Sequence, residues 1–132
     1  MRTITLILAF LCFSAVAVAK KFPLVTTPAT PAARGEVEAK TNKNGNTQVK
    51  IKVEHLAPPE NLVPPRTGYL VWFQQRDGTL ESKGRMRIDK NLKASFETTT
   101  PWKNFDVLIT AESDATIKAP SGQEVLKASV VQ

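Results

Sequence analysis

The sequence is poor in the residues that form covalent cross-links and common catalytic centres. It contains one cysteine, Cys12, and one histidine, His55, among its 132 residues. A single cysteine forms no intramolecular disulfide and supplies no second thiolate for a metal site. With one histidine, the chain has little provision for the general acid–base chemistry that enzymes use near neutral pH. The folded state must therefore be stabilised by its apolar core.

Long apolar runs are scarce as well, and the one that is present lies at the N-terminus. Residues 4–15 are almost entirely apolar, and they stand between the basic residue Arg2 and the small-x-small pattern Ala17-Val18-Ala19. This order is typical of a secretory signal peptide with its cleavage site. Because about 20 apolar residues are needed to span a membrane, an uncleaved anchor is the less favoured alternative. We expect residues 1–19 to be a signal peptide.

Cleavage after Ala19 changes what the exported part contains. It removes Cys12, and a small exported domain without cysteine is more typical of bacteria than of eukaryotes. No second apolar run of membrane-spanning length follows, so no membrane span is expected after cleavage. The predicted location is therefore the periplasm or the extracellular medium.

The first segment after the signal peptide lacks any regular alternation of apolar and polar residues. It contains Pro23, Pro28 and Pro31 together with several threonines and alanines. Prolines at this density favour an extended, polyproline-like conformation. We therefore predict a Pro/Thr/Ala-rich linker over residues 20–34 and one folded domain over residues 35–132, a length that suits a single core.

From residue 35 onward, short stretches of alternating apolar and polar residues are separated by turn residues. The clearest stretch contains Val49, Ile51 and Val53 with lysines between them, and Asn44-Gly45 and Asp77-Gly78 are typical of turns between antiparallel strands. Strands are predicted over residues 35–41, 47–56, 68–75, 82–89, 93–99, 105–113 and 124–131. This number and spacing predict an all-β fold, a seven-stranded immunoglobulin-like antiparallel β-sandwich.

The apolar residues of these strands define the predicted core. Residues 69–73 are apolar at every position, which is typical of a central strand, and Trp72 is predicted to be the main packing residue. The other expected core residues are Val49, Ile51, Val53, Phe96, Phe105, Val107 and Ile109.

Three short motifs resemble a known family. Tyr69-Leu70-Val71-Trp72-Phe73, Ile109-Thr110-Ala111-Glu112 and Pro120-Ser121-Gly122 are similar to a Tyr-x-x-Trp strand, a Thr-x-Glu strand and a Pro-x-Gly loop, in that order, in the extracytoplasmic C-terminal domain of bacterial anti-sigma-K factors. The resemblance covers about residues 49–131 and implies a β-sandwich outside the cytoplasm. The family's membrane helix and cytoplasmic sigma-binding region have no counterpart here, so sigma-factor binding is not implied.

Few side chains in the sequence suit catalysis. His55 stands at the end of an alternating stretch, where packing at the rim or at the edge of the core is the expected role. No serine lies in a nucleophile-elbow context, and Glu112, Asp114 and Glu60 lack the dense spacing of a calcium loop. We therefore expect no catalytic residue, no metal and no cofactor. The alternative is a small secreted hydrolase whose carboxylates assemble only in the fold.

The charge balance favours an anionic partner. The formal net charge is +6, a modest basic excess. If the strands over residues 35–41, 47–56, 82–89 and 93–99 share one sheet, its outer face presents Lys40, Lys50, Lys52, Arg85, Arg87 and Lys93. The favoured interpretation is nevertheless an ordinary solvated face, on which Glu38, Glu54 and Glu97 neutralise much of this charge through cross-strand pairs. A basic platform for an anionic glycan, an envelope polymer or a membrane surface is the alternative.

Trp102 is a second candidate binding residue. It follows Pro101 in a predicted turn, where it could form an apolar groove with Tyr69 and the Pro58-Pro59 and Pro64-Pro65 loop, or equally cap the open end of the core. The aromatic residues do not interleave with the basic ones, so nucleic acid is not an expected partner. We expect a monomeric, non-catalytic module with a binding or structural role in the bacterial envelope or outside the cell. Its partner is unidentified, and an anionic partner is one candidate, weakly favoured by the basic excess.

Overall fold

Strands account for most of the described chain. A computed structural model describes residues 18–132, so the predicted signal peptide lies outside the described residues except for Val18 and Ala19. A short 3₁₀ helix, η1 (Pro59–Asn61), lies in the connection between β3 and β4. The strands are β1 (Lys20–Thr26), β2 (Arg34–Thr41), β3 (Thr47–Glu54), β4 (Gly68–Gln74), β5 (Leu80–Ile88), β6 (Ala94–Thr100), β7 (Phe105–Glu112) and β8 (Gln123–Val130).

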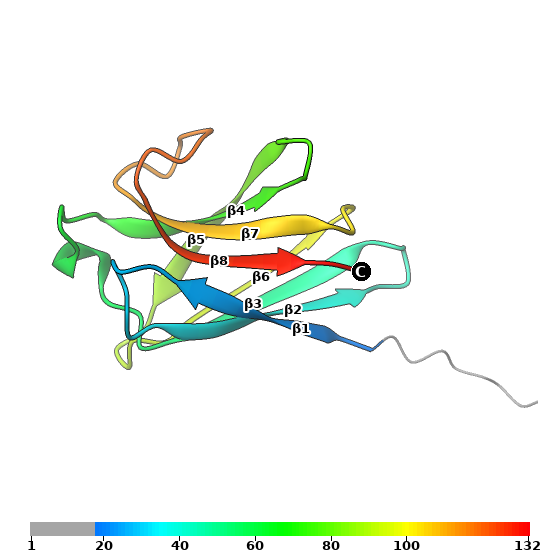
Figure 1. The fold of residues 1–132 in the computed structure, drawn as a ribbon, viewed down its shortest axis with the longest axis horizontal. Coiled ribbons are helices and arrows are strands. Elements are labelled where there is room, and N and C mark those ends of the chain that lie inside the picture. Colours follow the sequence, from blue (N-terminus) through cyan, green and yellow to red (C-terminus); the bar gives the residue numbers. More distant parts are fainter. Residues whose placement is uncertain (1–17) are drawn as a thin grey trace, which may run out of the picture.

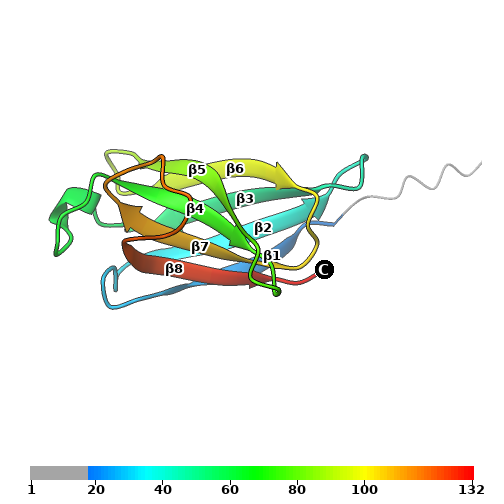
Figure 2. The same ribbon diagram turned by 90° about the horizontal axis from the view of Figure 1, so that it is seen from above.

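The strands of residues 18–132 form a closed antiparallel barrel in the order β1-β2-β3-β6-β5-β4-β7-β8. Figures 1 and 2 show that they run along the long axis of the molecule, so that the connecting loops gather at its two ends. The all-β class was predicted correctly. The prediction of a seven-stranded immunoglobulin-like β-sandwich was wrong, because the barrel has eight strands and is closed.

Two strands, β5 and β1, close the barrel because each changes its pairing partner along its length. β5 pairs with β4 along most of its length and with β6 through Arg87 and Ile88. β1 pairs with β2 from Lys20 to Leu24 and with β8 through Val25 and Thr26. In a sandwich the two sheets remain separate. Here β1 and β5 pass from one side to the other and join them.

β1 lies in the stretch that was predicted to be a linker. Pro23 obscures the strand in the sequence, but at Pro23 β1 pairs with β2 and not with β8. A strand with a free edge tolerates a proline, because no ladder hydrogen bond is lost on that side. The remainder, residues 27–33, is a packed connection in which the buried Thr30 hydroxyl donates a hydrogen bond of 3.2 Å to the Val125 carbonyl.

The barrel interior is filled by apolar side chains. Of the predicted core residues, all but Phe96 and Trp72 are buried in this interior, and Phe96 packs against it half-buried. Phe73 and Phe105 contact each other inside it, near the barrel end where β4 finishes and β7 begins, with tilted rings whose centroids are 4.6 Å apart. The buried residues predicted for this core are Val49, Ile51, Val53, Phe105, Val107 and Ile109.

Trp72 is fully buried, but outside the barrel wall. Successive residues of a strand point to opposite faces, so Tyr69, Val71 and Phe73 fill the interior while Leu70 and Trp72 point outward. Residues 113–122, which connect β7 to β8 and which we call the strap, cover this outer patch. Trp72 is the largest of the fully buried side chains in residues 18–132, as expected of a packing residue, but it does not join the main core. It packs in a second cluster with Leu70, Leu108, Leu80 and Ile117.

Candidate ligand-binding surface

One wall of the barrel carries most of the predicted binding residues. β2, β3, β6 and β5 are neighbours in that order, and we call their solvent-facing side the outer wall. The sequence predicted a basic face if these four strands lie in one sheet. The exposed or half-exposed residues that alternate with buried ones along β3 are Gln48, Lys50, Lys52 and Glu54, and those at the corresponding positions of β6 are Ser95, Glu97 and Thr99.

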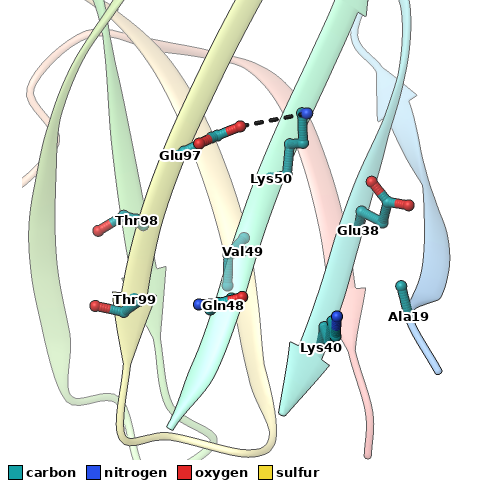
Figure 3. Close-up of a pocket in the computed structure, with 9 residues that line it drawn as sticks. All are labelled: Ala19, Glu38, Lys40, Gln48, Val49, Lys50, Glu97, Thr98 and Thr99. Carbon is teal, nitrogen blue, oxygen red and sulfur yellow. Dashed lines mark ion pairs between the residues drawn. The ribbon is translucent and has the colours of Figure 1, made fainter. Parts of the chain in front are cut away.

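Ion pairs neutralise part of the outer wall. Lys50 Nζ lies 3.3 Å from Glu97 Oε1 across the β3–β6 pair, as Figure 3 shows. Lys93 Nζ lies 4.0 Å from Glu54 Oε1. The cross-strand pairing expected of a solvated face is therefore present at Lys50 and Lys93. Because these side chains are exposed, each pair contributes little to stability.

A row of three outer-wall residues is not neutralised in this way. Lys52 on β3 stands opposite Ser95 on β6, which stands opposite Arg87 on β5. All three are exposed, and neither cation has an acidic partner within 4.0 Å in residues 18–132. Glu36, on the other side of Lys52, is paired instead with Lys21 at 3.8 Å. We call Lys52, Ser95 and Arg87 the cationic row.

Arg85 lies beside the cationic row, two residues before Arg87 on β5. Its guanidinium Nη2 donates a hydrogen bond of 2.7 Å to the Thr67 carbonyl. The guanidinium lies over Gly68, in space that any Cβ at that position would occupy. Arg85 is therefore held at the start of β4 and contributes positive charge to the edge of the row.

An open depression adjoins the row on the outer wall. Figure 3 shows the Lys50–Glu97 pair on one side of it and Gln48, Thr99 and Lys40 on the other. The depression is lined by both acidic and basic side chains, and two of them, Lys50 and Glu97, already form an ion pair with each other. The lining residues are Ala19, Glu38, Lys40, Gln48, Val49, Lys50, Glu97, Thr98 and Thr99.

Trp102 and Tyr69 do not form the predicted groove, because they lie at opposite ends of the barrel. Tyr69 is near the Gly68–Glu112 end of the β4–β7 pair, whereas Trp102 precedes Phe105 at the other end, as the strand directions in Figure 1 show. Trp102 is half-buried against the core, and its carbonyl accepts a hydrogen bond of 2.8 Å from the Thr47 hydroxyl. Trp102 therefore packs over one end of the barrel, which agrees with the alternative that it caps the core.

Tyr69 is inside the barrel and has no exposed surface. Its hydroxyl donates a hydrogen bond of 2.6 Å to the Ala57 carbonyl. Burial, with a smaller contribution from the negative charge of Glu60, raises the pKa of Tyr69 to about 12. Tyr69 is therefore a core residue that anchors the β3–β4 connection.

Glu112 is a buried carboxylate that holds the strap. It is 2% exposed, and it accepts hydrogen bonds from the Ser121 amide and hydroxyl and from the Gly122 amide, at 3.1, 2.8 and 3.0 Å. Thr110 Oγ1 donates another at 2.9 Å. Burial by itself would raise the pKa of Glu112, but these hydrogen bonds outweigh it and hold the pKa below its ordinary value.

The acids considered for a calcium site or a hydrolase are not brought together. Glu112 is enclosed by the strap, Asp114 accepts hydrogen bonds from the amide and hydroxyl of Thr116, and Glu60 is exposed in η1. In residues 18–132 no three His, Cys, Asp or Glu side chains are placed to hold a metal ion. His55 is exposed just after β3, with φ of 55°, so it lies at the rim and does not pack at the core edge.

The chain matches no family model and no curated protein. The resemblance to anti-sigma-K factors therefore stays a prediction. Across the described part of the chain, no helix has the length and apolar character required to cross a membrane.

The sequence reasoning missed Ser95 and the role of Glu112. Ser95 becomes important only because the β3–β6–β5 register places it between Lys52 and Arg87. For Glu112, the Pro-Ser-Gly stretch at residues 120–122 was a signal, since a serine and a glycine offer amide and hydroxyl donors in a tight loop. The sequence spacing of these groups did not indicate that they face one carboxylate.

Proposed function

We propose that this chain is an exported, non-catalytic module that binds an anionic polymer through the outer wall of its barrel. The observation that carries the proposal is the cationic row, where Lys52 and Arg87 are exposed and have no acidic partner within 4.0 Å among residues 18–132. Adjacent cations such as Lys50 are already paired within the protein. Unpaired cations on a regular surface raise the local concentration of anions and speed their association.

The environments of the buried ionisable groups support a role without catalysis. Tyr69 donates its hydroxyl proton to a backbone carbonyl, and both carboxylate oxygens of Glu112 accept hydrogen bonds from neighbouring residues. A catalytic acid or base must reach a substrate atom at hydrogen-bond distance. Neither group is placed to do so while the core and the strap remain folded.

Export is part of the proposal and rests on the N-terminal pattern. β1 begins at Lys20, so cleavage after Ala19 would leave every strand of the barrel intact. Cell fractionation followed by N-terminal sequencing tests this step. We expect the chain outside the cytoplasm to begin at Lys20. A chain found only in the cytoplasm and beginning at Met1 would contradict export without affecting the binding proposal.

Binding is tested by retention of residues 20–132, which contain all eight strands, on immobilised heparin and on phosphocellulose. We expect retention that weakens as salt is raised, because screening shortens the range of surface charges. Lys52→Glu with Arg87→Glu should abolish it. The matched control is Lys43→Glu with Lys118→Glu, which makes the same change in net charge at exposed lysines in the β2–β3 turn and the strap. Equal loss in the two double variants would show that net charge, not the outer wall, governs retention.

A further inference from the structure

We infer that the cationic row is a discrete oxyanion site, which takes one phosphate or sulfate group of the polymer between Lys52 and Arg87, above Ser95. This inference rests on the proposed function and names the chemical group that the outer wall binds. Directly opposed residues on neighbouring strands have Cβ atoms about 5 Å apart. Lys52 and Arg87 are two such steps apart, with only a serine between them, so their long side chains can converge above it.

The three side chains supply complementary hydrogen-bond donors. Arginine presents a planar fork that binds two oxygens of a phosphate, and lysine presents a compact charge with three donors. The Ser95 hydroxyl adds a short donor at the base of the site. A tetrahedral oxyanion has oxygens facing in several directions, so it can accept from all three at once. A planar carboxylate has fewer acceptor directions and satisfies fewer of them.

Four acids that border the row are engaged elsewhere, which leaves its positive charge available. A fifth, Glu60, lines a depression with Arg85 and Arg87, but within residues 18–132 no ion pair joins it to either arginine. Glu36 pairs with Lys21, Glu54 with Lys93, and Glu97 with Lys50. Asp89, at the end of β5, accepts hydrogen bonds from the backbone amides of Asn91 and Lys93 at 2.8 and 3.0 Å. Three of these acids are therefore paired with other lysines, and Asp89 is hydrogen-bonded to backbone amides. A ligand oxyanion can bind Lys52 and Arg87 without displacing an internal partner.

The decisive experiment places a negative charge inside the row and compares it with the same change outside it. Dissociation constants of residues 20–132 are measured for polyphosphate, dextran sulfate and polygalacturonate at one salt concentration. We expect both oxyanion polymers to bind at least tenfold more tightly than the carboxylate polymer. Ser95→Asp should weaken oxyanion binding at least tenfold, while Thr99→Asp, on the same face of β6, should weaken it less than threefold. Arg87→Lys keeps the charge but loses the fork, and should reduce the preference for oxyanions over carboxylates.

The outcomes separate this inference from the function on which it rests. Equal weakening by Ser95→Asp and Thr99→Asp, or equal affinity for the three polymers, would overturn a discrete oxyanion site while leaving anionic binding by the outer wall in place. Failure of all three polymers to bind the unchanged protein would overturn both. Binding of only one oxyanion polymer would identify whether phosphate or sulfate is the group recognised. Both substituted serine and threonine positions are exposed, and thermal unfolding of each variant verifies that the barrel is retained.

Discussion

The Trp72 indole Nε1 donates a hydrogen bond of 2.8 Å to Thr110 Oγ1, and this hydroxyl in turn donates to the Glu112 carboxylate at 2.9 Å. Glu112 then accepts from Ser121 and Gly122 in the strap. One chain of hydrogen bonds therefore connects the indole beneath the strap to the backbone of the strap itself. In a buried, low-dielectric setting each group depends on the others for its partner.

Removal of the Glu112 carboxylate should release the strap. Glu112→Ala leaves the buried Thr110 hydroxyl and the Ser121 and Gly122 amides without their acceptor, so we expect it to lower the free energy of unfolding by about 1–3 kcal/mol. The measurement is urea denaturation followed by tryptophan fluorescence, with Trp102→Phe as the background so that the signal reports Trp72 alone. Glu124→Ala, an exposed acid just beyond the strap, is the control and should leave the midpoint nearly unchanged. A similar loss in both variants would contradict the role of Glu112 in holding the strap.

The same carboxylate makes stability depend on acid pH. The pKa of Glu112 is lower in the folded protein than its ordinary value of 4.5, so its stabilisation is present above that value and is lost as pH falls through the folded pKa. Asp77 and Asp114 act in the same direction, because hydrogen bonds from Thr79 and Thr116 lower the pKa of each carboxyl. We expect the free energy of unfolding to decrease as pH falls below about 4.5.

Glu112→Gln isolates the share of this pH dependence that belongs to Glu112. The amide keeps the shape of the side chain but does not titrate, so the stability difference between the two proteins should be largest near neutral pH and shrink toward about pH 2. Urea denaturation at a series of pH values measures it. A difference that stays constant over this range would show that the Glu112 charge contributes nothing.

The local pattern of the sequence predicted the strands well, because each depends on nearby residues. The alternation of Val49, Ile51 and Val53 with lysines identifies β3, and Gly45 and Gly78 adopt φ of 79° and 93° in the predicted turns. Closure of the barrel is not a local property. It depends on β1, whose Pro23 conceals a strand, and on β5, which changes partner from β4 to β6 at Arg87.

The outer patch around Trp72 and the cationic row could not be predicted from the sequence either, because both depend on contacts between distant segments. Because β4 is apolar on both faces, each face must be buried by other residues. The sequence did not show that residues 113–122 bury the outer one. The basic face was predicted from the residues of four strands, and their adjacency proved correct. Which of its cations are neutralised depended on the register, which pairs Lys50 with Glu97 and sets Lys52 opposite Ser95.

Gly122 should tolerate no larger residue, because the strap approaches β7 closely at this point. A Cβ on Gly122 would overlap the Ala111 carbonyl oxygen, a backbone atom of the β7–β8 ladder that has little freedom to move. We expect Gly122→Ala to destabilise the protein by about 1–3 kcal/mol. Gly45→Ala is the comparison, since its Cβ meets no atom within 4 Å and its cost comes only from the left-handed backbone. Because a left-handed alanine itself costs about 1–2 kcal/mol, the thermal midpoints of both variants should fall. Trp72 fluorescence, measured in the Trp102→Phe background, separates the two causes and should change only in the Gly122 variant.

Tyr69 should ionise only in strongly alkaline solution. It is the one tyrosine of the chain, so the ultraviolet absorbance of phenolate reports it without interference. Burial raises its pKa from 10.0 to about 12, and the unfolded chain therefore loses this proton before the folded protein does. Stability is fully present below about pH 10 and declines as pH rises toward 12.

Two measurements test the origin of this shift. Phenolate absorbance in the folded protein should rise near pH 12, whereas in concentrated urea it should rise near pH 10, with both values set by the environment of the hydroxyl. Tyr69→Phe removes the hydrogen bond to the Ala57 carbonyl and should cost about 1–2 kcal/mol, and it should also eliminate the alkaline decline in stability. If the phenolate of the folded protein appears near pH 10, the hydroxyl is solvated, and the connection between β3 and β4 is not anchored at Ala57.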